Sequence, residues 1–347
     1  MAEQVSAAVP RTGGNSARFP GWEPRDFAPL ASLAVLFAFF MWATDLEFLR
    51  LSTLRQILAQ GSALAVVAVG LTFVLLCAEI DLAVGMVALW TACFCGWLYA
   101  WQLSLLPADA PRDLALARLL LVLLIPLASS LAFGLLSGTL TVWARLPSFI
   151  ITLAMMYIAD GAARWLTQSQ TQPVPDLLRI VGNRGFDLSD SFLLPYSALF
   201  AACTFVAAHL VLQHTRFGRY VYMTGGNREA ARLAGVRTGL IVVACLGISA
   251  CLAGLGGMIN AGRLGSVSLD QNSALLLEAV ACVVLGGTSL FGGEGGVGKT
   301  AIGVFTFTML KVGLAQISWI DDLARQALMG AVLLTALVVN GLLARRR

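Results

Sequence analysis

The sequence predicts an all-α fold, a polytopic membrane helix bundle of about ten transmembrane helices with both termini cytoplasmic. Hydrophobic residues make up 58% of the 347 residues and charged residues only 12%, too little charge to cover a soluble domain of this length. Apolar windows near the ~20 residues that a membrane-spanning helix needs recur along the chain. The predicted helices are 28–43, 57–78, 84–101, 119–140, 148–166, 193–212, 240–261, 274–290, 301–317 and 326–343.

The segment before the first helix, residues 1–27, is polar and contains several prolines and glycines, so it predicts a disordered cytoplasmic arm. We expect the first helix to be retained, because the large residues from Phe39 to Trp42 offer no small-residue site for signal-peptide cleavage. Residues 28–343 then form one transmembrane domain with a cytoplasmic loop at 213–239, and residues 344–347 form a basic cytoplasmic tail.

Two of the predicted helices carry further signals. In the fourth, Gly134 and Gly138 are spaced four residues apart, a pattern that lets helix backbones approach closely in lipid. The fifth helix contains Asp160, Gly161 and Arg164 in its far half. It is therefore either a broken or tilted helix that lines a cavity, or an ordinary helix whose last turn emerges near Asp160.

The net charge of +4 is too small to indicate a nucleic-acid-binding protein, and we expect no nucleic acid partner. The distribution of charge is more informative, because basic loops of membrane proteins favour the cytoplasmic side. The segment from Thr215 to Gly239 has a single acidic residue, Glu229. Its five arginines are Arg216, Arg219, Arg228, Arg232 and Arg237.

Within this basic segment, residues 229–234 (EAARLA) favour a short helix. Asn227 is a plausible N-cap after the turn at Gly225 and Gly226, and Gly235 can end the helix. The basic segment has three interpretations. It follows the positive-inside bias alone, it binds anionic lipid headgroups, or it docks another protein that grips the projecting helix.

Polar residues close to apolar spans are candidates for a translocation pathway, because a charge at membrane depth usually faces a cavity or a partner. Asp81 is interpreted as the N-cap of the third helix, whereas the role of Glu79 stays open. For Glu278 a polar contact with a neighbouring helix and a pathway role are equally plausible. The candidate pathway residues are Glu79, Asp81, Trp90, Asn260, Arg263 and Glu278.

A tempting motif lies in GEGGVGKT (293–300), which matches the phosphate-binding pattern GxxxxGK[ST] through Gly293, Gly298, Lys299 and Thr300. We reject nucleotide binding at this motif, because such a loop must join a strand to a helix in a soluble domain. Here membrane-length apolar segments stand on both sides. The motif is instead interpreted as a tight glycine-rich cytoplasmic turn between two helices.

Nothing in the sequence indicates catalysis, a cofactor or a metal. All seven cysteines fall in apolar segments, without zinc-ligand spacing or a disulfide framework. The two histidines, His209 and His214, have no nucleophile or carboxylate cluster beside them.

Several blocks of the chain resemble permease subunits of ribose-type ABC importers for monosaccharides. They are TRFGRYVYMTGGNREAARLAGV (215–236), AEIDLAVG (78–85), LPSFIITLAMMYIADGAARWLT (146–167), AGLGGMINAGRLGSVS (253–268) and LEAVACVVLGGTSLFGGEG (277–295). The resemblance implies a multi-pass permease of the bacterial inner membrane that pairs as two copies, most simply as a homodimer. It also implies a separate ABC ATPase subunit and a periplasmic sugar-binding protein.

By this resemblance, the ATPase grips the short cytoplasmic helix. The residues implied in ATPase coupling are Arg216, Gly218, Gly225, Gly226, Asn227, Glu229, Ala230, Ala231, Leu233 and Gly235. The chain departs from the family pattern at Glu278, where Asp is common, and at Glu79, where Gly is usual. These departures leave the choice of sugar open.

Three alternatives remain at this stage. The first is a related ABC permease for branched-chain amino acids or nucleosides. The second is a secondary transporter or channel that works without a partner ATPase. The third is a membrane-embedded nucleotide hydrolase that uses Lys299.

Overall fold

The structure is a computed structural model, and it describes residues 28–104, 112–189, 192–270, 272, 274–317 and 320–345. The arm predicted at residues 1–27 and the last two residues of the predicted basic tail lie outside the described residues. Within the described part the fold is almost entirely helical, as the sequence predicts. Its helices are α1 (Ala28–Ala43), η2 (Glu47–Leu49), α2 (Leu51–Leu76), α3 (Val84–Ser104), α4 (Arg112–Ala144), α5 (Ser148–Thr167), α6 (Asp176–Asn183), α7 (Tyr196–His214), α8 (Arg216–Gly226), α9 (Arg228–Leu233), α10 (Thr238–Leu264), α11 (Leu275–Leu285), α12 (Val297–Gln316) and α13 (Asp322–Arg345).

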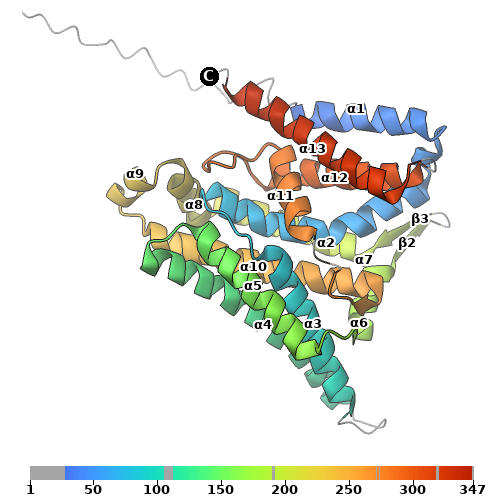
Figure 1. Ribbon diagram of the computed structural model, residues 1–347, viewed down its shortest axis with the longest axis horizontal. Coiled ribbons are helices and arrows are strands. Elements are labelled where there is room, and N and C mark those ends of the chain that lie inside the picture. Colours follow the sequence, from blue (N-terminus) through green and yellow to red (C-terminus); the bar gives the residue numbers. More distant parts are fainter. Residues whose placement is uncertain are drawn as a thin grey trace, which may run out of the picture.

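Two small antiparallel sheets accompany the helices. Strand β1 (Gln172–Pro173) pairs with β4 (Ser266–Val267), and β2 (Gly185–Ser189) pairs with β3 (Phe192–Pro195). In Figure 1, β2 and β3 lie at the side of the molecule opposite to α8 and α9. The short strands therefore mark one end of the bundle, and the α8–α9 pair marks the other.

Each of the ten apolar segments predicted from the sequence contains a helix in the structure, although residues 193–195, predicted as the start of a helix, lie in strand β3 and α7 begins only at Tyr196. Among the residues that the structure describes, seven helices are long and apolar enough to cross a membrane: α2, α3, α4, α5, α7, α10 and α12. The chain is thus a multi-pass membrane protein, while a total of ten spans and the cytoplasmic placement of both termini stay predictions.

The predicted helix 274–290 is wrong in its extent. Helix α11 has only 11 residues and ends at Leu285, which gives a length of roughly 16 Å, about half of a bilayer core. The chain then turns through a loop in which Gly287, Gly292, Gly293, Gly295 and Gly296 have positive φ angles. Gly287, two residues after the last helical residue, has a φ angle of +92°, which glycine adopts without steric cost, and this left-handed residue ends the helix before residue 290.

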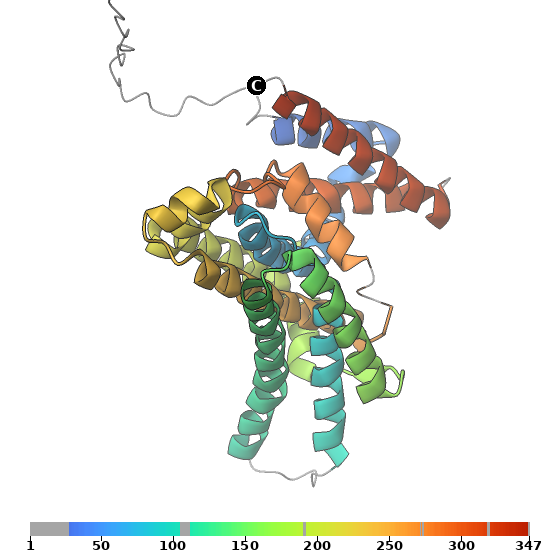
Figure 2. The ribbon, with the colours of Figure 1, turned by 60° about the vertical axis from the view of Figure 1, so that its left-hand side comes forward.

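Helix α2 lies at the centre of the bundle. Every residue from Gly61 to Leu76 is buried, so the helix is apolar on all sides rather than along one stripe. The largest core cluster joins this part of α2 to α3, α10, α11 and α12. Figure 2 shows α3 and α4 projecting together beyond the other helices, with α2 deep within the assembly.

Close contacts between small residues hold α4 against α10. A Cβ atom added at Gly134 would lie 2.4 Å from the carbonyl oxygen of Leu246, and one added at Gly138 would lie 2.6 Å from the Cα of Val243. Both separations are too short for any side chain, so the backbones can touch only because these positions are glycine. This confirms the packing role that their spacing predicts.

Helix α5 excludes a break in the fifth predicted helix. It runs as one continuous helix from Ser148 to Thr167, so the broken-helix interpretation is wrong, whereas its tilt in the membrane and the emergence of its last turn near Asp160 stay predictions. Asp160 and Arg164 form an ion pair with an N–O distance of 2.9 Å one turn apart on its partly exposed surface. The charges in the far half of the helix thus neutralise each other locally.

Candidate functional site

The basic loop at 213–239 folds into two helices, of which the sequence predicted only the second. Helix α8 begins after Thr215, whose hydroxyl accepts a hydrogen bond from the Gly218 N–H at 3.2 Å. Gly218, Val221 and Thr224 are buried at a spacing of three residues. This spacing and the threonine cap were readable signals of a helix. Gly225 and Gly226, predicted as a turn, instead form its last residues.

Helix α9 confirms the predicted cap and stop. The side-chain oxygen of Asn227 accepts a hydrogen bond from the Ala230 N–H at 2.9 Å, which is the N-cap arrangement. Gly235 has a φ angle of +83°, the left-handed conformation that ends many helices. The helix runs from Arg228 to Leu233, one residue earlier at each end than the predicted segment.

One side of α9 is buried and the other projects from the bundle. Ala231 is 2% exposed and packs into a core cluster with residues of α2, α7, α8 and α10. Leu233 is 87% exposed, although it is a large apolar residue. Glu229 and Ala230 are also exposed. A single exposed leucine is ordinary on a protein surface, so a partner on this side of α9 stays a prediction.

Two glycines bring the backbone of α8 into direct contact with α2 and α7. A Cβ atom at Gly225 would lie 1.8 Å from the carbonyl oxygen of Leu76, the last residue of α2. At Gly218 it would lie 2.1 Å from the carbonyl oxygen of Leu212 in α7. The backbone of α8 therefore rests directly on the ends of two membrane helices, and a movement of α8 reaches both.

The glycine-rich motif at 293–300 belongs to the same assembly. The Gly293 N–H donates to the carbonyl oxygen of Leu76 at 3.0 Å, and the Tyr222 hydroxyl donates to the carbonyl oxygen of Gly295 at 3.1 Å. The loop thus lies between α8 and the end of α2. It is a turn between α11 and α12, as the sequence predicts.

The surroundings of the motif differ from those of a phosphate-binding loop. The element before it is helix α11 and not a strand. The Thr300 hydroxyl, which would bind Mg²⁺ in such a loop, is fully buried and shares a 2.8 Å hydrogen bond with Thr72 of α2. Lys299 lies in the first turn of α12. These contacts support the rejection of nucleotide binding at Gly293, Gly298, Lys299 and Thr300.

The connection between α2 and α3 lies beside the α8–α9 pair. Arg228, the first residue of α9, donates to a carboxylate oxygen of Glu79 at 2.5 Å and to the Cys77 carbonyl oxygen at 3.3 Å. Glu79 is only 6% exposed, so its charge is buried and paired. The sequence left the role of Glu79 open, and the structure gives it this partner from α9.

Side chains of α5 hold the backbone of this connection in place of helical hydrogen bonds. The Ile80 N–H donates to the Ser148 hydroxyl at 3.0 Å, and the Leu82 N–H donates to the Thr152 hydroxyl at 3.1 Å. Non-helical backbone within a membrane protein is stable only when its polar groups are satisfied in this way. The connection is therefore a defined structural element rather than a loose loop.

Asp81 is buried in the same connection. Its carboxylate accepts hydrogen bonds from the Ala83 N–H at 3.0 Å and from the Ser249 hydroxyl of α10 at 2.8 Å. Because α3 begins only at Val84, the interpretation of Asp81 as the N-cap residue is wrong by two positions. Burial raises the pKa of the Asp81 carboxyl to about 6, and the hydrogen bonds from Ser249 and Ala83 partly oppose this shift.

The other candidate pathway residues lie in separate groups. The Trp90 indole donates to the Ser129 hydroxyl at 2.9 Å, which places it in the contact between α3 and α4. Glu278 of α11 accepts a hydrogen bond at 2.6 Å from Lys311 of α12, a partner that sequence reasoning missed. This is a polar contact with a neighbouring helix, one of the two roles left open for Glu278.

Asn260 and Arg263 are connected on α10. Arg263 donates a hydrogen bond to the side-chain oxygen of Asn260 at 3.1 Å. The Asn260 amide nitrogen in turn donates to the side-chain oxygen of Asn272 at 3.0 Å. Asn272 is fully buried and was not among the predicted residues. The six candidates therefore form no single cluster. Glu79 and Asp81 lie next to α9, whereas Arg263 lies at the far end of α10.

Comparison with known proteins agrees with this architecture. A family model described as branched-chain amino acid transport system / permease component matches residues 53–337. The ribose import permease protein RbsC of Escherichia coli (strain K12) is 31% identical over 315 residues, which cover 90% of this chain and 92% of that protein.

Two further relatives match over similar lengths. The xylose transport system permease protein XylH of Escherichia coli (strain K12) is 26% identical, with 99% of this chain and 98% of that protein covered. The autoinducer 2 import system permease protein LsrC of Photorhabdus luminescens is 29% identical, with 91% and 90% covered. No solved structure is a significant match. Since the family match spans most of the sequence, this chain belongs to the family of branched-chain amino acid transport system permease components.

Proposed function

We propose that this chain is the membrane-spanning subunit of an ATP-driven importer that moves a monosaccharide or a related polyol across the bacterial inner membrane. A separate ABC ATPase subunit supplies the energy, and a periplasmic binding protein delivers the sugar. Two copies of the permease pair in the complex. Relatives that are named for the import of ribose, xylose and autoinducer 2, each matched over about nine tenths of the chain or more, support this assignment.

The observation that carries the proposal is the projecting helix α9. Its cap at Asn227 fixes its start, its exposed Leu233 offers a contact to the ATPase, and its Arg228 is bound to the connection between α2 and α3. A helix of this kind transmits force because both of its sides are engaged. The ATPase holds the exposed side, and the bundle holds the buried side at Ala231.

The substrate class rests on the individual relatives rather than on the description of the family. That description refers to branched-chain amino acids, whereas the relatives reported above are named for other compounds. An amino acid is the alternative substrate, and it requires a site that neutralises both an ammonium and a carboxylate group. The two substrate classes are separated by a direct uptake measurement.

Uptake into proteoliposomes tests the proposal. The chain is reconstituted with its partner ABC ATPase subunit and sugar-binding protein, and uptake of radiolabelled D-ribose, D-xylose and L-leucine is followed with and without ATP. We expect uptake of a sugar that requires ATP and both partners. Uptake that continues unchanged without the ATPase would instead identify a secondary transporter, and ATP-dependent uptake of leucine alone would identify an amino acid importer.

A further inference from the structure

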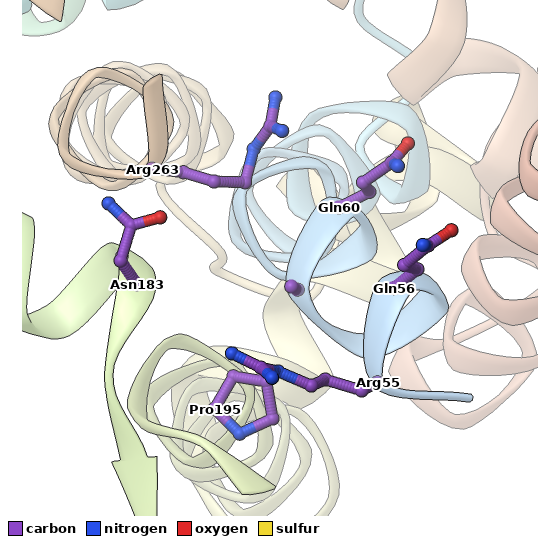
Figure 3. A pocket seen from close by; sticks show the side chains of 8 residues that line it. Arg55, Gln56, Gln60, Asn183, Pro195 and Arg263 are labelled. Carbon is purple, nitrogen blue, oxygen red and sulfur yellow. The ribbon is translucent and has the colours of Figure 1, made fainter. Parts of the chain in front are cut away.

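A polar cavity of about 200 Å³ lies at the end of the bundle opposite to α9. It is lined by Arg55, Gln56, Ala59 and Gln60 from the first turns of α2, together with Asn183 at the end of α6 and Arg263 near the end of α10. Figure 3 shows these side chains around a common space, with Arg55 extending over Pro195. Three elements distant in sequence thus contribute to one site.

Close backbone contact fixes the wall that α6 and α10 share. A Cβ atom at Gly182 would lie 2.3 Å from the backbone nitrogen of Arg263, and one at Gly262 would lie 2.1 Å from the carbonyl oxygen of Leu178. The Asn183 amide donates to the Gly262 carbonyl oxygen at 2.9 Å, which also orients its side chain. The cavity is therefore built into the fold rather than left between loosely packed loops.

The lining carries many hydrogen-bonding groups that the protein does not use. Arg55 and Gln56 are exposed and Gln60 is half-buried, and none of these three side chains has a hydrogen-bond partner among the described residues. The Nε atom of Arg263 is buried and also lacks a partner there. A buried donor without a partner is costly, and a ligand that supplies an acceptor removes this cost.

The chemistry of the lining favours a polyhydroxylated ligand over an amino acid. Guanidinium groups donate hydrogen bonds, and the amides of Gln56, Gln60 and Asn183 both donate and accept. Sugar hydroxyls match this set, because each accepts and donates as well. In the described part of the chain the lining has no carboxylate to neutralise an ammonium group, and only Ala59 and Pro195 offer apolar surface to a branched side chain.

A chain of side chains leads from the cavity into the bundle. Arg263 is bonded to Asn260, and Asn260 is bonded to Asn272. Asn272 is 0% exposed, and its amide nitrogen has no partner among the described residues. Its backbone oxygen lies next to Gly85 at the start of α3. The polar groups therefore continue inward from the cavity toward the helix that follows Asp81.

We propose that this cavity binds a neutral monosaccharide or polyol as it enters the bundle, with Arg55, Gln60 and Arg263 as its principal contacts. The inference rests on the proposed function and adds to it the place where the substrate is first held. The polar chain from Arg263 to Asn272 marks the inward direction from this site.

Protection of a reporter cysteine tests the cavity directly. Ala59→Cys is introduced into a variant in which the exposed Cys203 and the half-buried Cys251 are replaced by serine, since the other native cysteines are buried. The full chain in lipid nanodiscs is then labelled with a polar maleimide in the presence of D-ribose, D-xylose, D-gluconate or L-leucine. Leu177→Cys on α6, exposed and outside the lining, serves as the matched control.

We expect ribose or xylose at about 100 mM, well above a millimolar dissociation constant, to slow labelling of Ala59→Cys several-fold and to leave Leu177→Cys unchanged. Adding Arg263→Gln, or Gln60→Leu if that variant folds poorly, abolishes the protection. Labelling that neither sugar slows would overturn the proposal. Protection by gluconate alone would contradict the proposal that the ligand is neutral. Protection by leucine alone would contradict the proposal that the ligand is a sugar or polyol.

The outcome is independent of the uptake test. ATP-dependent sugar uptake without protection of Ala59→Cys contradicts sugar binding in the cavity and leaves the proposed function standing. Protection by a sugar without ATP-dependent uptake contradicts the proposed function and leaves the cavity as a sugar site.

Discussion

Arg228 of α9 donates a hydrogen bond at 2.5 Å to the buried carboxylate of Glu79 in the connection between α2 and α3. This ion pair joins residues separated by 149 positions in the sequence. Through it, the helix that projects from the bundle is tied to a segment whose backbone is held by α5 and whose Asp81 is held by α10. A displacement of α9 would therefore act on α5 and α10 through this one connection.

Breaking this pair is expected to uncouple ATP hydrolysis from transport. Arg228→Gln leaves the Glu79 carboxylate buried without its partner, at a cost of about 2–4 kcal/mol after allowing for the partly exposed arginine. We expect sugar uptake to fall at least about tenfold, while the ATPase still binds through the exposed side of α9. Uptake and ATP hydrolysis in proteoliposomes, measured together, check this.

A charge exchange separates the ion pair from a general loss of structure. The double variant Glu79→Arg with Arg228→Glu restores the attraction and should recover part of the uptake, which a double-mutant cycle quantifies. Arg219→Gln, an exposed arginine of α8 outside the residues implied in ATPase coupling, is the control and should have little effect. Equal losses in the control and in Arg228→Gln would contradict the role of the pair.

The sequence was sufficient to predict the long apolar helices, because hydropathy along a membrane segment is a local property. The more polar helices α6 and α8 were not predicted. The sequence also predicted α9 correctly, since Asn227 and Gly235 act on their nearest neighbours. The length of α11 was missed because its apolar pattern continues to Leu290, while the chain turns at Gly286 to Gly296. There, glycine conformation outweighed hydropathy.

The candidate site was less predictable, because its contacts are tertiary. Glu79, Asp81 and Glu278 were recognised as unusual polar residues, yet their partners Arg228, Ser249 and Lys311 come from distant helices. The cavity residues Arg55 and Gln60 gave no signal, since polar residues near the start of a helix are ordinary. Only the packing of α6 against α10 brings Asn183 and Arg263 to them.

Leu233 is expected to be needed for the ATPase and not for folding. It is 87% exposed, so Leu233→Glu should leave the melting temperature of the isolated permease within about 1 °C. The same change places a charge in the proposed interface, and we expect co-purification of the ATPase to be lost. Ala231→Glu on the buried side is the contrasting variant, and it should destabilise the permease itself.

The same substitution at two neighbouring glycines of α8 is expected to change the stability of the protein by different amounts. A Cβ atom at Gly225 would collide with the Leu76 carbonyl oxygen at 1.8 Å, so Gly225→Ala should destabilise the protein by about 2 kcal/mol or more. At Gly226 nothing lies within 4 Å, and Gly226→Ala should be neutral or slightly stabilising. Thermal unfolding in detergent compares them, and equal destabilisation would show that α8 does not rest on α2.

Lys299 is not expected to bind nucleotide. Binding of a fluorescent ATP analogue to the purified permease without its ATPase should be no stronger than to Lys299→Ala, because the loop before Lys299 joins two helices. Thr300→Val should instead destabilise the protein by about 1 kcal/mol, since it removes the buried hydrogen bond to Thr72. Saturable binding that Lys299→Ala abolishes would revive the nucleotide hydrolase alternative.

Asp81 should make the stability of the permease depend on pH. Burial raises its pKa from 3.8 to about 6, so between these values the folded protein binds more protons than the unfolded chain. Stability contributed by this group is therefore greatest below about pH 4, falls as the pH rises to about 6, and is constant above. The fall is on the order of 3 kcal/mol, because each pKa unit corresponds to about 1.4 kcal/mol.

Asp81→Asn cannot ionise, and its amide can still accept a hydrogen bond from Ala83 and contact Ser249, so this variant should lose the pH dependence. Melting temperatures of both proteins between about pH 4.5 and 7 measure the difference. Asp160→Asn, on the partly exposed surface of α5, is the control, and parallel curves for Asp81→Asn and the unmodified chain would contradict a buried carboxylate that titrates near pH 6.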